Sequence, residues 1–198
     1  ERDRLWIASG YQGLVLVYDG KEERFTVENG LHDNSVYQFL KTSDAKLYVI
    51  GDGGMSEIIV NTDKTVSFKK YHSQPNISQY AKFFSAVEAP DGTIWLGGEE
   101  GIVYLRNDSL YKFTFNNKQL SVNFLIKDKE GTVWVATSGE GILQCRFSEK
   151  NELEIVKQFT ESDGLNTLHY LTLLADKENN IWAGSSRGIS VIGTKGKK

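Results

Sequence analysis

Short apolar runs alternate with turn residues along the whole chain, and this pattern predicts β-strands. A clear case is the apolar run at residues 83–87, which is followed by the turn Asp91-Gly92 and a second run at 93–97. Asp-Gly between two apolar runs predicts a hairpin, because the turn needs a positive φ that glycine adopts without steric cost. No stretch of helical length has apolar residues three and four apart, so the pattern favours an all-β fold.

The second run of each hairpin carries an aromatic residue that recurs at a period of about 44 residues, followed by a small, glycine-rich turn. The five aromatic residues are Trp6, Tyr48, Trp95, Trp134 and Trp182. Several short strands per unit at this period are typical of a β-propeller blade. The sequence therefore predicts one propeller region over residues 1–198, with five units at approximately 1–31, 32–79, 80–118, 119–165 and 166–193 and a tail at 194–198.

Each complete unit contains four runs, which predict a four-stranded antiparallel meander. Polarity rises from the first run to the fourth. We therefore expect the first strand to line the central axis, buried on both faces, and the fourth to form the solvent-exposed outer edge of the blade. The aromatic residues are expected to pack between neighbouring blades. Small residues two positions after the aromatic would let the blades approach closely: Ala8, Gly97, Ala136 and Gly184.

The first unit lacks its first strand, and the last unit lacks its fourth. These two ends cannot complete one another within a single blade, so the chain is expected to be an arc of a larger propeller. A closed five-bladed ring is the alternative. An arc would expose apolar blade faces, and we therefore expect self-association.

Two similar phrases lead into first strands, Phe-Thr-Val-Glu-Asn-Gly-Leu at residues 25–31 and Phe-Thr-Glu-Ser-Asp-Gly-Leu at 159–165. Together with the hairpin phrase they resemble the two-component-regulator propeller repeat. The resemblance implies a seven-bladed propeller in the periplasmic sensor region of a bacterial hybrid histidine kinase, often one that senses glycans. It further implies a periplasmic or extracellular location, and additional blades and a membrane-proximal module as partners.

Composition narrows the classes of partner. Acidic and basic residues are interspersed and the net charge is −3, so no basic face for a nucleic acid is expected. No apolar run is long enough to cross a bilayer, and we expect no membrane contact by this segment. The single cysteine, Cys145, lies in an apolar run and is expected to be a buried, inert thiol.

No constellation for catalysis or metal binding emerges from the sequence. The three histidines, His32, His72 and His169, do not recur at equivalent positions, and each is expected in a solvated loop. We therefore expect no catalytic residues, no metal and no cofactor. Non-enzymatic sensing is the leading hypothesis. A protein-interaction scaffold is the alternative, and a propeller lyase, which needs a paired His and Glu with a metal, is a third class.

Propeller geometry predicts where a ligand would bind. The connection between consecutive units and the turn after each aromatic emerge on the same face, so their polar and aromatic side chains gather there. Loops of this kind on a rigid scaffold suit a small molecule or an oligosaccharide. The candidate ligand-binding residues are Tyr11, Gln12, His32, Asp33, Asn34, Glu99, Glu100, Glu140, His169 and Arg187.

Overall fold

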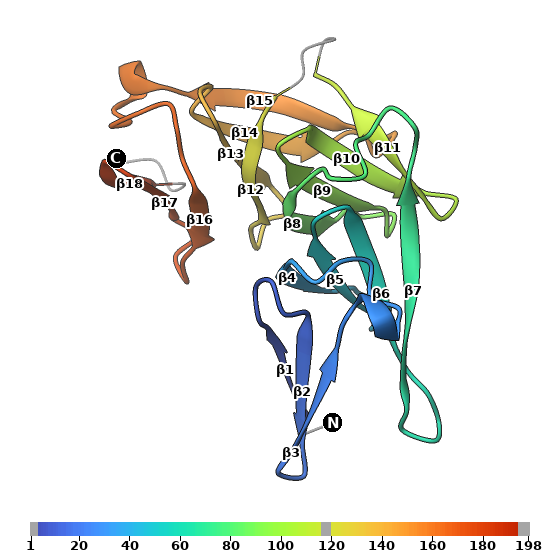
Figure 1. Cartoon of the computed structure of the whole chain (residues 1–198). Helices are drawn as coiled ribbons and strands as arrows, with labels where there is room; N and C mark the ends of the chain where they lie inside the picture. The colour runs from blue at the N-terminus through green and yellow to red at the C-terminus, as the bar shows by residue number, and fades with distance from the viewer. Residues whose placement is uncertain (1–3, 116–119, 194–198) are drawn as a thin grey trace. The chain divides into compact units, whose positions relative to one another are not determined.

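The computed structural model describes residues 4–115 and 120–193, which form β-strands and two short 3-10 helices (Figure 1). Consecutive strands are neighbours in five antiparallel groups that follow the predicted units.

The first group is β1 (Arg4–Ala8), β2 (Leu14–Tyr18) and β3 (Lys21–Phe25), and the second is β4 (Val36–Lys41), β5 (Leu47–Gly51), β6 (Gly54–Val60) and β7 (Val66–Ser73). The third is β8 (Phe83–Glu88), β9 (Ile94–Gly98), β10 (Gly101–Arg106) and β11 (Ser109–Phe113), and the fourth is β12 (Val122–Lys127), β13 (Val133–Thr137), β14 (Ile142–Phe147) and β15 (Leu153–Phe159). The fifth is β16 (Thr172–Ala175), β17 (Ile181–Ser185) and β18 (Gly188–Ile192). These groups are the predicted blades, and the all-β propeller class is confirmed.

The chain divides into two compact units, which are described separately. The first contains Glu1–Phe84 and Arg106–Tyr111, and the second contains Ser85–Leu105 and Lys112–Lys198. Within the first unit, β11 and β7 pair in parallel through Ser109 with His72 and Leu110 with Ser73. The Gln74 N–H extends this pairing by donating to the Leu110 carbonyl oxygen at 3.1 Å. This pairing between outer strands was not predicted from the sequence.

The hairpin between the first and second strands closes through one recurring turn in the second to fifth blades. Its third residue has a positive φ in every copy, with values of 66° at Ala45, 84° at Gly92, 83° at Gly131 and 67° at Asn179. Glycine and asparagine suit this left-handed conformation, whereas alanine pays a steric penalty in it. The predicted hairpins are thus confirmed even where the sequence does not read Asp-Gly.

Burial along the strands differs from the expectation that the first strand is buried on both faces. Every residue of β9 and of β13 is buried, and in β13 apolar clusters cover both faces. Among the first strands, β8 is mostly buried, whereas β4 and β16 each have exposed positions. The prediction was therefore wrong for β4 and β16, because successive side chains point to opposite faces: in β16, Leu173 joins an apolar cluster while Leu174 is exposed.

The aromatic stripe packs between blades, as predicted, where the structure describes both partners. Trp95 joins Val122, Leu125 and Val133 of the following blade in one buried cluster, and Trp134 packs with Tyr170 and Leu173 of the blade after it. Trp6 likewise packs against the cluster that contains Val49 and Ile58 of the second blade. Tyr48 is buried, but Trp182 is largely exposed.

The small residues after the aromatic have two different roles. A Cβ at Gly97 would come within 2.7 Å of the Val122 Cγ1 and 2.9 Å of the Leu125 Cγ in the next blade, as expected for close blade contact. At Gly184 the crowding atom is the Thr172 Cγ2 of its own sheet, 2.9 Å away, so that glycine serves strand pairing instead.

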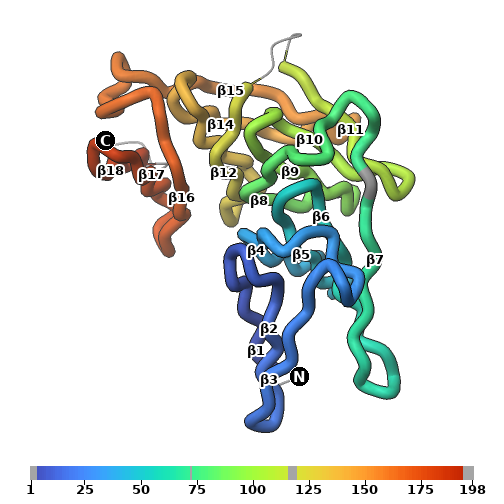
Figure 2. Tube along the Cα trace, viewed as in Figure 1, coloured from blue at the N-terminus to red at the C-terminus, as the bar shows by residue number. Residues whose placement is uncertain are grey.

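The two Phe-Thr-…-Gly-Leu phrases each form a 3-10 helix, Val27–Asn29 and Glu161–Asp163, that the sequence did not predict. Asn29 Oδ1 accepts from the Thr26 N–H at 2.9 Å, and Asp163 Oδ2 accepts from the Thr160 N–H at 3.0 Å. Each helix then ends at a glycine with a left-handed φ, Gly30 at 100° and Gly164 at 95°. The leucine that follows each of these glycines, Leu31 or Leu165, is buried in the core. Figure 2 traces the chain through these connections.

Candidate ligand-binding rim

In the first of the two compact units, the β1–β2 turn and the connection from β3 to β4 lie side by side along one edge of the sheets. The Gly13 N–H donates to the Asn34 carbonyl oxygen at 2.8 Å, and the Val36 N–H donates to the Gly10 carbonyl oxygen at 3.2 Å. The β5–β6 turn continues this edge, because the Asp52 N–H donates to the Ser35 carbonyl oxygen at 3.1 Å. We call these three segments, residues 9–13, 32–37 and 52–53, the first-unit rim. The expected proximity of the two kinds of connection is observed here.

The second unit repeats the arrangement with different residues. The Gly139 and Gly141 N–H groups both donate to the Leu168 carbonyl oxygen, at 3.0 and 2.8 Å. Ser138 and His169 form a backbone bridge, which brings the turn that carries Glu140 beside the connection that carries His169. The Asn166 Nδ2 donates to the Arg187 carbonyl oxygen at 3.3 Å, so the β17–β18 turn joins the same edge.

Several candidate residues already bond to the backbone or to other side chains of the protein. Asn34 Oδ1 accepts from the Val27 N–H at 3.0 Å, and Asp33 Oδ1 accepts from the Ser35 N–H at 2.8 Å. Gln12 Oε1 accepts from Arg24 Nη1 at 3.1 Å, and Glu100 forms an ion pair with Lys112 at 2.8 Å. In contrast, Tyr11, Glu99, His169 and Arg187 project exposed side chains. Ligand binding by any of the ten candidates stays a prediction.

His32 does not lie in a solvated loop, so that expectation is corrected. Its backbone N–H donates to the Oγ of the fully buried Ser56 at 3.0 Å, and its ring Nδ1 forms a second hydrogen bond with the same oxygen at 2.9 Å. Burial is the main reason why the pKa of the His32 ring falls to about 4, with the nearby positive charge of Lys70 acting in the same direction and Asp33 opposing it. His32 is therefore neutral near pH 7. His169 is exposed. His72 does not lie in a loop either, because its backbone belongs to β7 and pairs with Ser109; its side chain lies outside the described residues.

Ser56 Oγ accepts from the His32 backbone N–H and also shares a hydrogen bond with ring Nδ1, in which either atom donates according to the tautomer of the ring. Nε2 is buried and has no hydrogen-bond partner in the described part of the chain. A Cβ at Gly51 would stand 3.2 Å from Nε2 and would overlap the Ser35 carbonyl oxygen, so the close approach of this ring requires a glycine.

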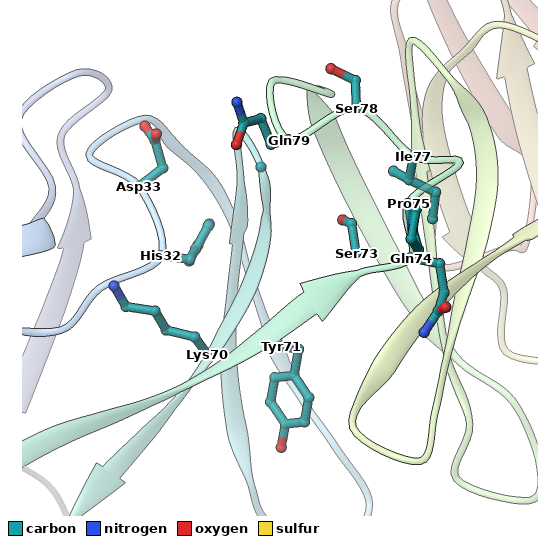
Figure 3. Close-up of a pocket in the computed structure, with 11 residues that line it drawn as sticks. His32, Asp33, Lys70, Tyr71, Ser73, Gln74, Pro75, Ile77, Ser78 and Gln79 are labelled. Carbon is teal, nitrogen blue, oxygen red and sulfur yellow. The ribbon is translucent and has the colours of Figure 1, made fainter.

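An open pocket of about 500 Å³ lies next to the first-unit rim. Figure 3 shows His32, Asp33 and Lys70 along one side and Ser73, Gln74 and Pro75 along the other, with Gln79 between them. Ser73 Oγ is a second buried polar atom without a hydrogen-bond partner among the described residues. Buried polar groups are normally paired, so two unpaired atoms beside one polar pocket mark it as a place where an occupant could satisfy them.

Two further rim residues, Tyr37 and Asp52, and the neighbouring Phe84 were not predicted from the sequence. Tyr37 in β4 donates its hydroxyl hydrogen to Asp52 Oδ1 at 3.1 Å, and its ring centroid lies 5.6 Å from that of Phe84 in β8. Tyr37 and Phe84 stand eleven positions before the repeated aromatic residues Tyr48 and Trp95. Both were assigned to strand cores, and the exposure of this position was hidden by the assumption that first strands are buried on both faces.

Comparison with known proteins supports the same architecture. No protein-family model matches the chain. A curated relative, histidine kinase P4 of Formosa agariphila, is 26% identical over 71% of this chain, which corresponds to 11% of the kinase. The solved extracellular domain of BT4673 from B. thetaiotaomicron, described as a one component and as a hybrid two component system, aligns with 96% of this chain and 26% of its own length, at a TM-score of 0.75 and 22% identity. The chain resembles two-component sensors. It spans about a quarter of the solved sensor domain.

The same fold also occurs in an enzyme. Virginiamycin B lyase from Staphylococcus aureus aligns with 98% of this chain and 64% of its own length, at a TM-score of 0.68 and 16% identity. At that identity the match shows the fold alone. The described residues contain no group of three or more His, Cys, Asp or Glu side chains placed to hold a metal ion. They also contain no helix that is long and apolar enough to span a membrane.

Proposed function

We propose that this chain is a non-enzymatic, ligand-binding segment of the extracellular or periplasmic sensor region of a bacterial two-component signalling protein. The observation that carries the proposal is the rim. Backbone hydrogen bonds tie the turn after the aromatic to the connection into a neighbouring blade in both units. Such hydrogen-bonded polar connections on a rigid sheet are a suitable binding surface, and the similar proteins include the extracellular domain of a two-component system and a histidine kinase.

The proposed ligand is a glycan, and further blades and a membrane-proximal module of the parent protein are the proposed partners. The rim offers polar groups and exposed aromatic rings, which suit hydroxyl-rich molecules with apolar ring faces. The chain also aligns with only part of each sensor relative, which agrees with five blades acting as an arc of a larger propeller.

Binding of soluble oligosaccharides to the 198-residue chain, measured by calorimetry, tests this function. Tyr11→Ala tests the rim of the first compact unit, and Arg187→Ala separately tests the rim of the second. A change in the rim that holds the ligand is expected to weaken binding with little loss of stability, since surface changes typically alter the free energy of unfolding by less than about 0.5 kcal/mol. Asp91→Asn in the β8–β9 turn, at the other end of its strands, is the control and should bind normally. Binding that survives both rim changes but falls with Asp91→Asn would place the ligand elsewhere and reject the rim.

A further inference from the structure

An aromatic surface lies on the first-unit rim between two turns. Tyr37 in β4 is 37% exposed, and Phe84 packs against it with an angle of 56° between the ring planes. Tyr11, which is 79% exposed, directly follows Gly10, and the Gly10 carbonyl oxygen accepts from the Val36 N–H, one residue before Tyr37. Aromatic rings that remain partly open to water at a rim are available to a ligand.

The ring of Tyr37 is held at two points. Its hydroxyl donates to Asp52 Oδ1 at 3.1 Å, and its ring packs against the tilted ring of Phe84, with 5.6 Å between the ring centroids. Partial burial, followed by the hydrogen bond to the Asp52 carboxylate, raises the pKa of Tyr37 to about 12, so the hydroxyl stays protonated and keeps donating. A ring fixed in this way loses little conformational entropy when a flat partner stacks on it.

The carboxylate beside the ring adds polar recognition. Asp52 is partly exposed, and among the described residues its Oδ2 receives no hydrogen bond and joins no ion pair. Asp52 is followed by Gly53, which lines the polar pocket containing His32, Lys70 and Gln79. The same two-residue turn therefore contacts Tyr37 through Asp52 and lines the pocket through Gly53.

We propose that the first-unit rim binds a neutral oligosaccharide, with one pyranose ring stacked on Tyr37, its hydroxyl groups donating to Asp52, and an adjoining sugar unit in the pocket beyond Gly53. The inference rests on the proposed sensor function. A pyranose ring has an apolar face of C–H groups and an edge of hydroxyl groups, which match an aromatic ring with a carboxylate acceptor at its edge. The pocket supplies amide, hydroxyl and ammonium groups for the hydroxyls of the second unit.

The equivalent position, eleven residues before the repeated aromatic, does not carry an aromatic surface in the fourth and fifth blades of the second compact unit. Asn123 stands at the equivalent place in β12, where its Nδ2 donates to the Tyr170 carbonyl oxygen at 2.7 Å and its Oδ1 accepts from Ser138 at 3.0 Å. Leu171, eleven residues before Trp182, is 50% exposed but aliphatic. Among the described copies, the aromatic pair thus belongs to the first-unit rim, and Leu171 provides a matched control.

The test uses the whole chain and a panel of soluble gluco-, manno-, galacto- and xylo-oligosaccharides together with acidic uronic-acid oligomers. Calorimetry gives the affinities, and saturation-transfer NMR reports which sugar protons contact aromatic rings. Tyr37→Ala should weaken binding of the neutral ligand about tenfold or more, whereas Tyr37→Phe keeps the stacking ring and should lose only about two- to fivefold. Asp52→Asn should weaken binding, and Leu171→Ala should leave it unchanged.

Saturation transfer should be strongest at the C–H protons of one sugar face and should disappear in Tyr37→Ala, while circular dichroism shows that each variant is folded. If the chain binds a neutral oligosaccharide equally well with and without the Tyr37 ring, the stacking site alone is rejected. Binding confined to the acidic oligomers rejects the neutral ligand class. Absence of binding to the entire panel rejects glycan sensing itself, and the stacking site with it.

Discussion

At the scale of the residue, His32 shows how a position without a repeat signature can be a fixed part of the structure. The sequence places it in a connection, and nothing local predicts that the chain brings buried Ser56 from β6 against it. His32 and Ser56 are 24 residues apart in the sequence, and their contact depends on Gly51, which leaves room for the imidazole ring. The sequence therefore predicted the connection but not the buried imidazole within it.

The lowered pKa of His32 makes stability depend on pH. Its folded-state pKa is about 4, against 6.5 for the ordinary group, so between these values the unfolded chain takes up a proton that the folded chain does not. The contribution of His32 is thus fully present above pH 6.5 and is lost as the pH falls toward 4. We expect the free energy of unfolding to decline over this window by at most about 1.4 kcal/mol per pH unit.

Urea unfolding at a series of pH values measures this slope. His32→Asn retains an acceptor for the Ser56 hydroxyl but does not titrate, so it should flatten the curve between pH 6.5 and 4. His169→Asn, a change at an exposed histidine, should leave the slope in place. An identical pH profile in wild type and His32→Asn would show that the buried imidazole contributes nothing to the pH dependence.

At the scale of the element, the turn between the first two strands of a blade also anchors the repeated aromatic. Asp128 Oδ2 accepts from the Trp134 Nε1 at 2.9 Å, and Asp176 Oδ2 accepts from the Trp182 Nε1 at 2.9 Å, each across six residues. Ala89 stands at the equivalent place before Trp95. The buried Trp95 Nε1 accordingly has no hydrogen-bond partner among the described residues.

This difference predicts unequal effects of the same substitution. Trp134→Phe should destabilise the protein more than Trp95→Phe, by about 1–2 kcal/mol, because only the first change removes a hydrogen bond from a buried carboxylate. Both changes delete the same atoms from a buried aromatic, so the packing loss is matched. Denaturant unfolding of the two variants gives the comparison, and equal shifts in the midpoint would mean that the Asp128 contact adds no net stability.

The strands and hairpins were predictable because each is encoded by a local pattern that recurs in every unit. The predicted run at residues 83–87 differs from β8 by one residue, and the run at 93–97 differs from β9 by one residue at each end. Features that depend on distant segments were missed, such as the parallel pairing of β7 with β11 and the contact of Tyr37 with Asp52. Alternation within one strand cannot show which distant segment covers each face, and for this reason the burial of the first strands was mispredicted.

At the scale of the whole molecule, the blades share one sequence pattern but differ in how their apolar faces are covered. Trp134 in the fourth blade is only 1% exposed, since Tyr170 and Leu173 of the fifth blade pack over it. In the fifth blade, Leu174, Trp182 and Val191 form a cross-strand row on β16, β17 and β18, and all three are exposed, Trp182 at 42%. A contiguous apolar row of this kind favours association.

We therefore expect the 198-residue chain to self-associate through this row. Sedimentation velocity over a range of concentrations should show the weight-average mass rising for the wild type. The double change Leu174→Ser with Val191→Ser should reduce that rise, while its unfolding midpoint stays close to the wild-type value because both side chains already contact water. Val156→Ser, which alters an exposed apolar residue of β15 outside the row, is the control and should associate like the wild type. A wild-type chain that remains monomeric across the series would show that the row is covered in solution, and association unchanged by the double variant would assign it to a different surface.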